Sequence, residues 1–241
     1  MPFTFAHPAL ILPLRYLPKK WFSLTGLIIG SLIPDFEYFL RMKIKSNYSH
    51  TIGGLFWFDL PLALLIAFTF HHIVRNQLIA NLPSLLKSRF IHYQTFNWNK
   101  HFRKNSFVVL YSILVGASSH LFWDSFTHHD GYFVSQMSYL KNVIKINNFH
   151  IPILKALQHS STFFGAIVIT YTIYKLPSKN MVQQPINFKY WSICTGLTCT
   201  IIAIRLLTGL DIKQYGNVIV TTISAFLISL ILTPLLTKTI K

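Results

Sequence analysis

The residues best suited to chemistry in this 241-residue sequence are its eleven histidines and six carboxylates. His120 and Asp124 are four residues apart, a spacing that places an imidazole and a carboxylate on one face of a helix. Two side chains at this spacing are a common way for a helix to present metal ligands. Nitrogen and oxygen donors together suit zinc, manganese or iron. The pair therefore predicts a divalent metal ion, with zinc foremost.

The composition shows which elements must position these side chains. Apolar residues make up 52% of the chain and charged residues 12%, about half of the roughly 25% usual in soluble domains. This composition excludes a disordered chain and argues against a soluble domain. The net charge of +16 comes from basic residues that punctuate apolar runs, so we expect membrane lipids as partners and no nucleic acid. The sequence predicts an all-α, multi-pass integral membrane protein.

The apolar runs predict an N-terminal helical hairpin and about five membrane-spanning helices in a single domain, 1–241. The hairpin has arms at 5–17 and 21–39 and a tip at Pro18–Lys20, and Pro34 is expected to interrupt the second arm. The runs of about 20 apolar residues that a bilayer requires lie at 52–74, 106–126, 159–176, 190–210 and 217–236. Residues 75–105 are expected to form a long basic loop. The motif-bearing part is 1–130, and the C-terminal transmembrane helices occupy 159–241.

Alternating spans gather the polar side chains at one face of the membrane. The hairpin returns the chain so that its first histidine lies level with the acid near the end of the second arm. The residues expected at this face are His7, Asp35, His50, His120, Asp124, His128 and His159. Carboxylates retained within a span cost about 2.5–3.5 kcal/mol on insertion scales, so they require a partner or a function.

Other polar residues have less definite roles. Glu37 either orients a histidine or is an interfacial carboxylate. His129 is a spare donor beside His128. Asp59 lies about 13 Å deeper than His50 along a helix, which favours a structural role. Four further histidines are expected on the basic side, in contact with water or lipid headgroups: His71, His72, His92 and His101.

Three segments give the chain a resemblance to known proteins: Met1–Pro8, Gly30–Tyr38 and Ser49–Thr51. They resemble a bacterial membrane family known as domain of unknown function 4184, over most of residues 1–130. That resemblance implies a bacterial cytoplasmic membrane as the location.

A more distant similarity is to membrane-bound metal-dependent hydrolases and to the zinc-dependent phospholipase C and single-strand nuclease fold. It implies a phosphoester hydrolase whose metal ligands are His7, Asp35, His50, His120, Asp124 and His128. The soluble enzymes end their motif with His-x-x-x-Glu, whereas His159 is followed four residues later by Phe163. This departure favours one or two metal ions over a full cluster of three.

The functional hypothesis is a metal-dependent hydrolase acting on a lipid or lipid-linked phosphoester at one membrane face. In such an enzyme Asp35 or Glu37 accepts the proton of the attacking water. The alternatives are a non-enzymatic protein whose cluster clamps helices together, a transporter with a proton or ion relay, and a haem-binding span. Carboxylates beside the histidines argue against haem.

The distribution of basic residues predicts the orientation of the cluster. Alternating spans place 14 basic residues on one side and 8 on the cluster side, and the richer side is expected to be cytoplasmic. A topology reporter fused at Asn148 should therefore behave as external, and one fused after Lys241 as internal. The reverse result would place the cluster at the cytoplasmic face.

Overall fold

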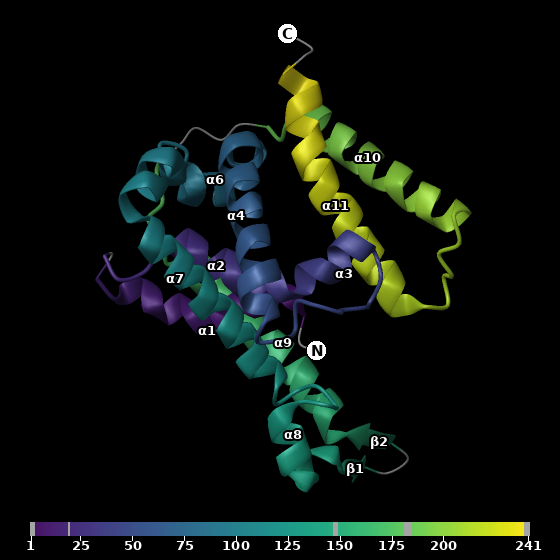
Figure 1. Ribbon diagram of the computed structural model, residues 1–241. Coiled ribbons are helices and arrows are strands. Elements are labelled where there is room, and N and C mark those ends of the chain that lie inside the picture. The colour runs from purple at the N-terminus through teal and green to yellow at the C-terminus, as the bar shows by residue number, and fades with distance from the viewer. Residues whose placement is uncertain (1–2, 19, 147–148, 181–184, 239–241) are drawn as a thin grey trace. The chain divides into compact units, whose positions relative to one another are not determined.

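The computed structural model describes residues 3–18, 20–146, 149–180 and 185–238 (Figure 1). Its helices confirm the all-α class. They are accompanied by one small antiparallel sheet of β1 (Val143–Ile146) and β2 (Phe149–Pro152). Lys19 of the expected hairpin tip and the reporter positions Asn148 and Lys241 lie outside the described residues.

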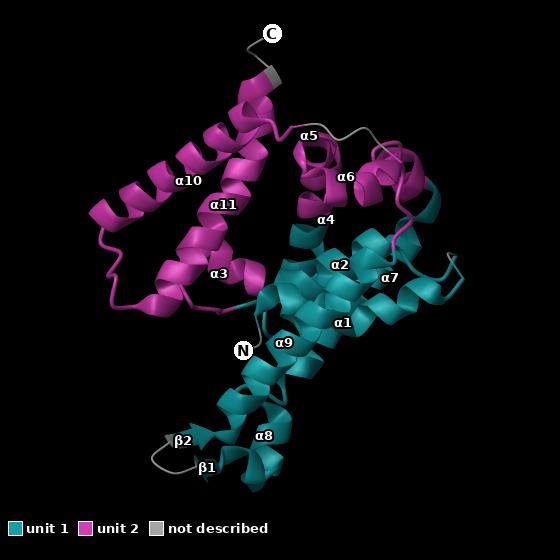
Figure 2. Ribbon diagram, turned by 180° about the vertical axis from the view of Figure 1, so that it is seen from behind, with its two compact units in different colours: residues 1–34, 48–63, 104–175 teal, residues 35–47, 64–103, 176–241 magenta. Residues whose placement is uncertain are grey.

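The chain forms two compact units, which Figure 2 distinguishes by colour. Unit 1 comprises residues 1–34, 48–63 and 104–175, and unit 2 comprises 35–47, 64–103 and 176–241. Elements within unit 1 are η1 (Thr4–Ala6), α1 (Pro8–Ile11), η2 (Leu12–Tyr16), α2 (Leu24–Leu32), the π-helical turn η4 (Leu55–Asp59), α8 (Tyr132–Gln136), η7 (Ser138–Lys141), β1, β2 and α9 (Ile153–Tyr174). Those within unit 2 are α3 (Phe36–Arg41), the π-helical turn η5 (Phe70–Val74), α5 (Arg75–Asn81), α6 (Ser84–Phe90), η6 (Ile91–Tyr93), α10 (Phe188–Leu207) and α11 (Tyr215–Lys238). The elements η3 (Ile33–Asp35), α4 (Leu60–Thr69) and α7 (Trp98–Asp124) have residues in both units.

The N-terminal segment of unit 1 folds back on itself as predicted, because α1 packs against α2. Ile11, Leu12 and Leu27 form the apolar core between these helices. The first arm is a series of short helices rather than one helix. Pro8 and Pro13 each stand in the first turn of such a helix, where a missing N–H is tolerated.

The second arm is interrupted where Pro34 predicts. Ser23 caps the N-terminus of α2 by accepting a hydrogen bond of 3.3 Å from Gly26 N. The α-helical geometry then gives way to the 3₁₀ turn η3, which contains Pro34. The change of geometry ends α2 before residue 35.

Glycines let α2 and α7 approach closely in unit 1. A Cβ on Gly116 would meet Ser31 N at 2.7 Å and would also overlap Leu27 O, and a Cβ on Gly30 would overlap Ile113 O. Small residues at such crossings bring helix backbones together in membrane proteins. The close approach brings backbone carbonyls of α2 within reach of side chains on α7.

Four helices among the described residues are long and apolar enough to cross a membrane. They are Leu55–Asn81, Trp98–Asp124, Phe188–Leu207 and Tyr215–Thr237, and they correspond to four of the five predicted spans. The fifth, 159–176, overlaps α9 (Ile153–Tyr174), which is not among the four. Its first half is polar, with Gln158, His159 and Ser160 in succession. The chain is an integral membrane protein by the length and composition of these helices.

The prediction of a loop at 75–105 was wrong, because helices occupy most of these residues. Unit 2 contains α5, α6 and η6 there, and α7 begins at Trp98. His71 was also misplaced by the sequence, since it is buried rather than solvated. Its Nδ1 lies 2.9 Å from Arg75 Nη1, and its ring stacks on Trp98 at 4.6 Å. The basic composition of this segment predicted side chains exposed to water. Arg75 instead donates a hydrogen bond to the backbone carbonyl oxygen of Phe96 at 2.7 Å.

Two matched glycine substitutions test the close approach of α2 and α7. Gly116→Ala should lower the free energy of unfolding by about 1–3 kcal/mol, because the added methyl group meets backbone atoms that cannot yield. Gly196→Ala in α10, with nothing within 4 Å of the new Cβ, should leave stability unchanged or raise it by up to about 1 kcal/mol. Thermal denaturation in detergent, followed by circular dichroism, measures both. Equal stability of the two variants would contradict the packing described.

Candidate metal centre

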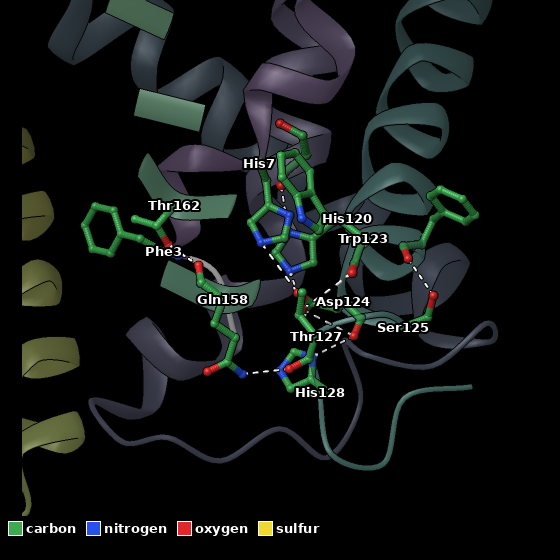
Figure 3. Close-up of polar contacts among 12 residues, drawn as sticks. Phe3, His7, His120, Trp123, Asp124, Ser125, Thr127, His128, Gln158 and Thr162 are labelled. Carbon is green, nitrogen blue, oxygen red and sulfur yellow. Dashed lines mark hydrogen bonds and ion pairs between the residues drawn. The ribbon is translucent and has the colours of Figure 1, made fainter. Parts of the chain in front are cut away.

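A buried carboxylate at the end of α7 is the centre of the polar cluster in unit 1. Asp124 is 4% exposed and is surrounded by imidazole rings, three of which are drawn with it in Figure 3. The nitrogen–oxygen distances to its carboxylate are 3.3 Å for His120 Nε2, 3.4 Å for His128 Nδ1, 3.6 Å for His7 Nε2 and 3.7 Å for His50 Nε2. His7 faces Oδ1, whereas the other three rings face Oδ2.

Local structure explains how α7 presents two of these groups. His120 and Asp124 are one turn apart on the helix, as their spacing predicts. His120 is fully buried, and its Nδ1 lies 2.8 Å from the carbonyl oxygen of Ser31 on α2. Because a carbonyl oxygen only accepts, Nδ1 carries the hydrogen. In the neutral ring this is the tautomer that turns the lone pair of Nε2 toward Asp124.

His7 reaches the cluster from the start of α1. Its ring is 1% exposed and stacks on His120, with centroids 3.6 Å apart and planes 11° from parallel. Trp123 closes the other side with an edge contact of 5.6 Å. This stacking fixes the plane of the His7 ring and directs its Nε2 edge to Asp124.

His50 belongs to the turn that precedes η4. Its Nδ1 lies 3.1 Å from the hydroxyl of buried Ser49, an arrangement that orients Nε2 toward Asp124. The turn is closed by Thr51, whose hydroxyl donates to Tyr48 O at 2.7 Å and accepts from Gly54 N at 2.9 Å. Gly54 is required because a Cβ there would overlap Tyr48 O.

His128 approaches Asp124 with a different nitrogen from the other three rings. Its Nδ1 lies 3.4 Å from Oδ2 and also 3.2 Å from the backbone carbonyl oxygen of Asp124. Burial lowers the pKa of the His128 imidazole, and the neighbouring carboxylate opposes this effect. Gln158 of α9 donates to Thr127 O at 2.7 Å and so fixes the turn that carries the ring. His128 is thus placed to orient the carboxylate.

The remaining predicted site residues are not among the four histidines that pair with Asp124. His129 and His159 are exposed on unit 1, and Asp59 is fully buried in η4. Asp35 and Glu37 are both buried and belong to unit 2, where Asp35 follows directly on Pro34, the last residue of the first segment of unit 1.

Glu37 organises the turn that follows α3. Its Oε1 accepts hydrogen bonds from Arg41 Nη2 at 2.7 Å and from Asn47 N at 2.9 Å. Its Oε2 accepts from Ser46 Oγ at 3.0 Å. Both oxygens are therefore engaged as acceptors in holding 37–47 together.

The donor set fits a metal ion. One ligand atom each from His50, His120 and Asp124 can be chosen so that all three lie within 4.8 Å of one another. Charge-assisted hydrogen bonds from imidazole to carboxylate measure about 2.7–2.9 Å. The separations of 3.3–3.7 Å exceed that range. They are close to the ~3.4 Å between two vertices of a tetrahedron with ligands about 2.0–2.1 Å from a zinc ion. These His and Asp groups could hold a metal ion.

Comparison with protein families identifies the chain. The model of the family described as Domain of unknown function (DUF4184) matches residues 1–235. The chain belongs to this family. The match confirms the resemblance that the first octet and the Gly30–Tyr38 stretch predicted, and it extends the resemblance beyond residue 130 to the C-terminal helices of DUF4184. Comparisons with curated proteins and with solved structures gave no match.

Two residues of the cluster in this DUF4184 chain were missed by sequence reasoning. Ser31 contributes only a backbone carbonyl, which any residue type supplies, so its identity gave no signal. Ser49 precedes His50 directly, and a hydroxyl beside a predicted ligand is a signal that could have been used.

Proposed function

We propose that this protein holds a divalent metal ion beside Asp124 and hydrolyses a lipid or lipid-linked phosphoester. The observation that carries the proposal is that ligand atoms of His50, His120 and Asp124 lie within 4.8 Å of one another, at nitrogen–oxygen separations that suit ligands of a common ion better than direct hydrogen bonds. The proposed ligands from unit 1 are His7, His50, His120 and Asp124. His128 is assigned a positioning role because its Nδ1 faces the Asp124 carbonyl.

Zinc is the ion that this donor set favours. The donors are imidazole nitrogen and carboxylate oxygen, which zinc accepts readily, and manganese or iron also bind such groups. The Ser31 carbonyl and the Ser49 hydroxyl contact the far nitrogens of His120 and His50. Partners of this kind are typical of histidines that ligate metals, since they fix the tautomer and direct the other nitrogen inward.

Hydrolysis is the reaction that the distant resemblance and the donor set together favour. A zinc ion at such a site lowers the pKa of a water molecule and polarises a phosphoryl oxygen. Asp35 remains the proposed acceptor for the proton of the attacking water, as the sequence predicts. Glu37 is assigned to positioning, since hydrogen-bond donors engage both of its oxygens. The exposed side chain at His159 and the phenylalanine four residues later limit the proposal to one or two ions.

A lipid substrate is favoured by the surroundings of His50. The side chains of His50 and His128 are 21% and 26% exposed, so the cluster opens on their side. The segment after His50 exposes Ile52 at 79% and Trp57 at 59%. Apolar side chains beside a polar cluster suit an amphiphile whose headgroup reaches the site while its chains remain in the bilayer.

Metal analysis of purified protein tests the metal centre. After reconstitution with zinc and removal of excess ion, the wild-type protein should retain zinc, whereas His120→Ala and Asp124→Ala should lose it. The matched controls His129→Ala and His159→Ala should retain it, because both side chains are exposed. Asp59→Asn should lower thermal stability but retain zinc, since Asp59 is buried in η4. Absence of zinc from the wild type, with cluster variants that merely melt earlier, would establish a structural clamp.

Turnover of a defined lipid tests the hydrolase. Zinc-loaded protein in vesicles of phosphatidylcholine and phosphatidylglycerol should release headgroups detectable by phosphorus NMR. Asp35→Asn should lower the rate by about 10²–10⁴-fold, the usual contribution of a general base, while retaining zinc. His159→Ala should turn over at the wild-type rate. If the protein retained zinc but released no headgroups, the metal centre would be supported and hydrolysis of these lipids would be rejected. A transport or relay function predicts that result.

A further inference from the structure

Residues 132–146 and 149–152 form a projection of unit 1 that the proposed hydrolase does not use. This hairpin arm contains α8, η7, β1 and β2, and in Figure 2 it extends from the N-terminal end of α9, away from α1, α2 and α7. The strands pair in an antiparallel register that aligns Val143 with Pro152 and Lys145 with His150. An isolated hairpin of two strands is marginally stable in water, so the arm requires support from its surroundings.

The base of the arm is fixed to the end of α7. The N–H groups of Phe133 and Val134 both donate to Ser125 O, at 3.1 and 3.4 Å. The ring of Phe133 stacks on Phe126 at 4.1 Å, and Val134 is fully buried. Because α7 is one of the candidate spans and ends at Asp124, we expect the arm to start near the boundary of the membrane.

The arm exposes several large apolar and aromatic side chains among polar ones. Its exposed large side chains are Tyr132 at 66%, Tyr139 at 67%, Met137 at 47%, Val143 at 45%, Ile144 at 40% and Ile151 at 39%. Tyrosines are enriched where a membrane meets water, because the ring is apolar and the hydroxyl is wet. These side chains have the composition of an interfacial surface.

The charge of the arm is of one sign. Residues 132–152 contain Lys141 and Lys145 and no Asp or Glu, and Lys155 follows in the first turn of α9. Lysines beside exposed apolar side chains attract anionic lipid headgroups. A second copy of the arm presents the same positive charge, so like-charge repulsion opposes covering this surface by self-association.

We propose that the hairpin arm lies in the headgroup layer of the membrane on the side of the Asp124 cluster and binds anionic phospholipid there. Lys141 and Lys145 contact lipid phosphates, while Tyr139, Ile144 and the cross-strand partner Ile151 lie among the upper parts of the acyl chains. The proposal rests on the fixed base at Ser125, the exposed apolar side chains and the uniform charge, and it holds whether or not the protein is a hydrolase.

An environment-sensitive fluorophore at Ile144 tests this placement. In full-length protein with Cys194→Ser and Cys199→Ser, Ile144→Cys is labelled with a nitrobenzoxadiazole group and reconstituted into vesicles. In phosphatidylcholine with phosphatidylglycerol, emission should shift to shorter wavelength. Lipids carrying a headgroup nitroxide should quench it, and aqueous iodide should not. In phosphatidylcholine alone the shift should be smaller.

Two matched charge variants distinguish the arm from basic residues elsewhere. Lys141→Gln with Lys145→Gln should abolish the dependence on phosphatidylglycerol, whereas Lys43→Gln with Lys45→Gln, an exposed lysine pair in unit 2 whose substitution removes the same charge, should leave it unchanged. Quenching by iodide and not by the lipid nitroxide would place the arm in water and overturn the proposal. Shielding from both quenchers that increases with the protein-to-lipid ratio would show that a second copy covers the arm, and would overturn it equally.

Discussion

The buried carboxylate of Asp124 is the constraint on which unit 1 depends. A charged group at the end of a membrane-spanning helix is costly unless neighbours compensate it. The ion pairs that the structure describes for Asp124 are all with histidines, drawn from the start of α1, the turn before η4, α7 itself and the turn after it. An imidazole can offer either a proton or a lone pair, whereas a lysine at physiological pH offers only protons. The same surroundings that stabilise the carboxylate are therefore able to accept a metal ion.

Glycine contacts set the accuracy of this arrangement. The backbone of α2 reaches His120 only because Gly30 and Gly116 allow the two helices to approach without intervening side chains. The tautomer of His120 thus depends on packing about one helical turn away along α7. The close packing of α2 and α7, the hydrogen bond from His120 to the Ser31 carbonyl and the direction of the His120 Nε2 lone pair therefore depend on one another.

Much of the fold and part of the candidate site follow from the sequence. Apolar runs of sufficient length predicted four spans, and Pro34 predicted the interruption after α2, because hydropathy and proline act locally. The i, i+4 pair on α7 was predictable for the same reason. The gathering of His7 and His50 at Asp124 followed from alternating spans, a topological argument that needs no contact to be known.

Other features depend on tertiary contacts that residue types do not encode. Basic composition predicted a solvated loop at 75–105, but Arg75 is buried against carbonyls of residues 94 and 96 and stabilises helices there. The hairpin arm is not predicted by the sequence, because its strands are only four residues each. His159 was expected at the cluster because the topology places it at the same depth in the membrane. Its side chain is nevertheless exposed, because depth does not determine which face of α9 a side chain occupies.

The wide separation of the cluster residues along the chain has a consequence for biosynthesis. His7 is made 113 residues before His120, so neither it nor His50 can meet its partners until α7 has been translated. At a synthesis rate of about 5–20 residues per second, several seconds pass before α7 is made and these imidazoles can contact their partners. Completion of α7 then adds the carboxylate of Asp124, the imidazole of His120 and the glycine contacts together. The cluster can therefore assemble only after the first half of the protein has been inserted and packed correctly.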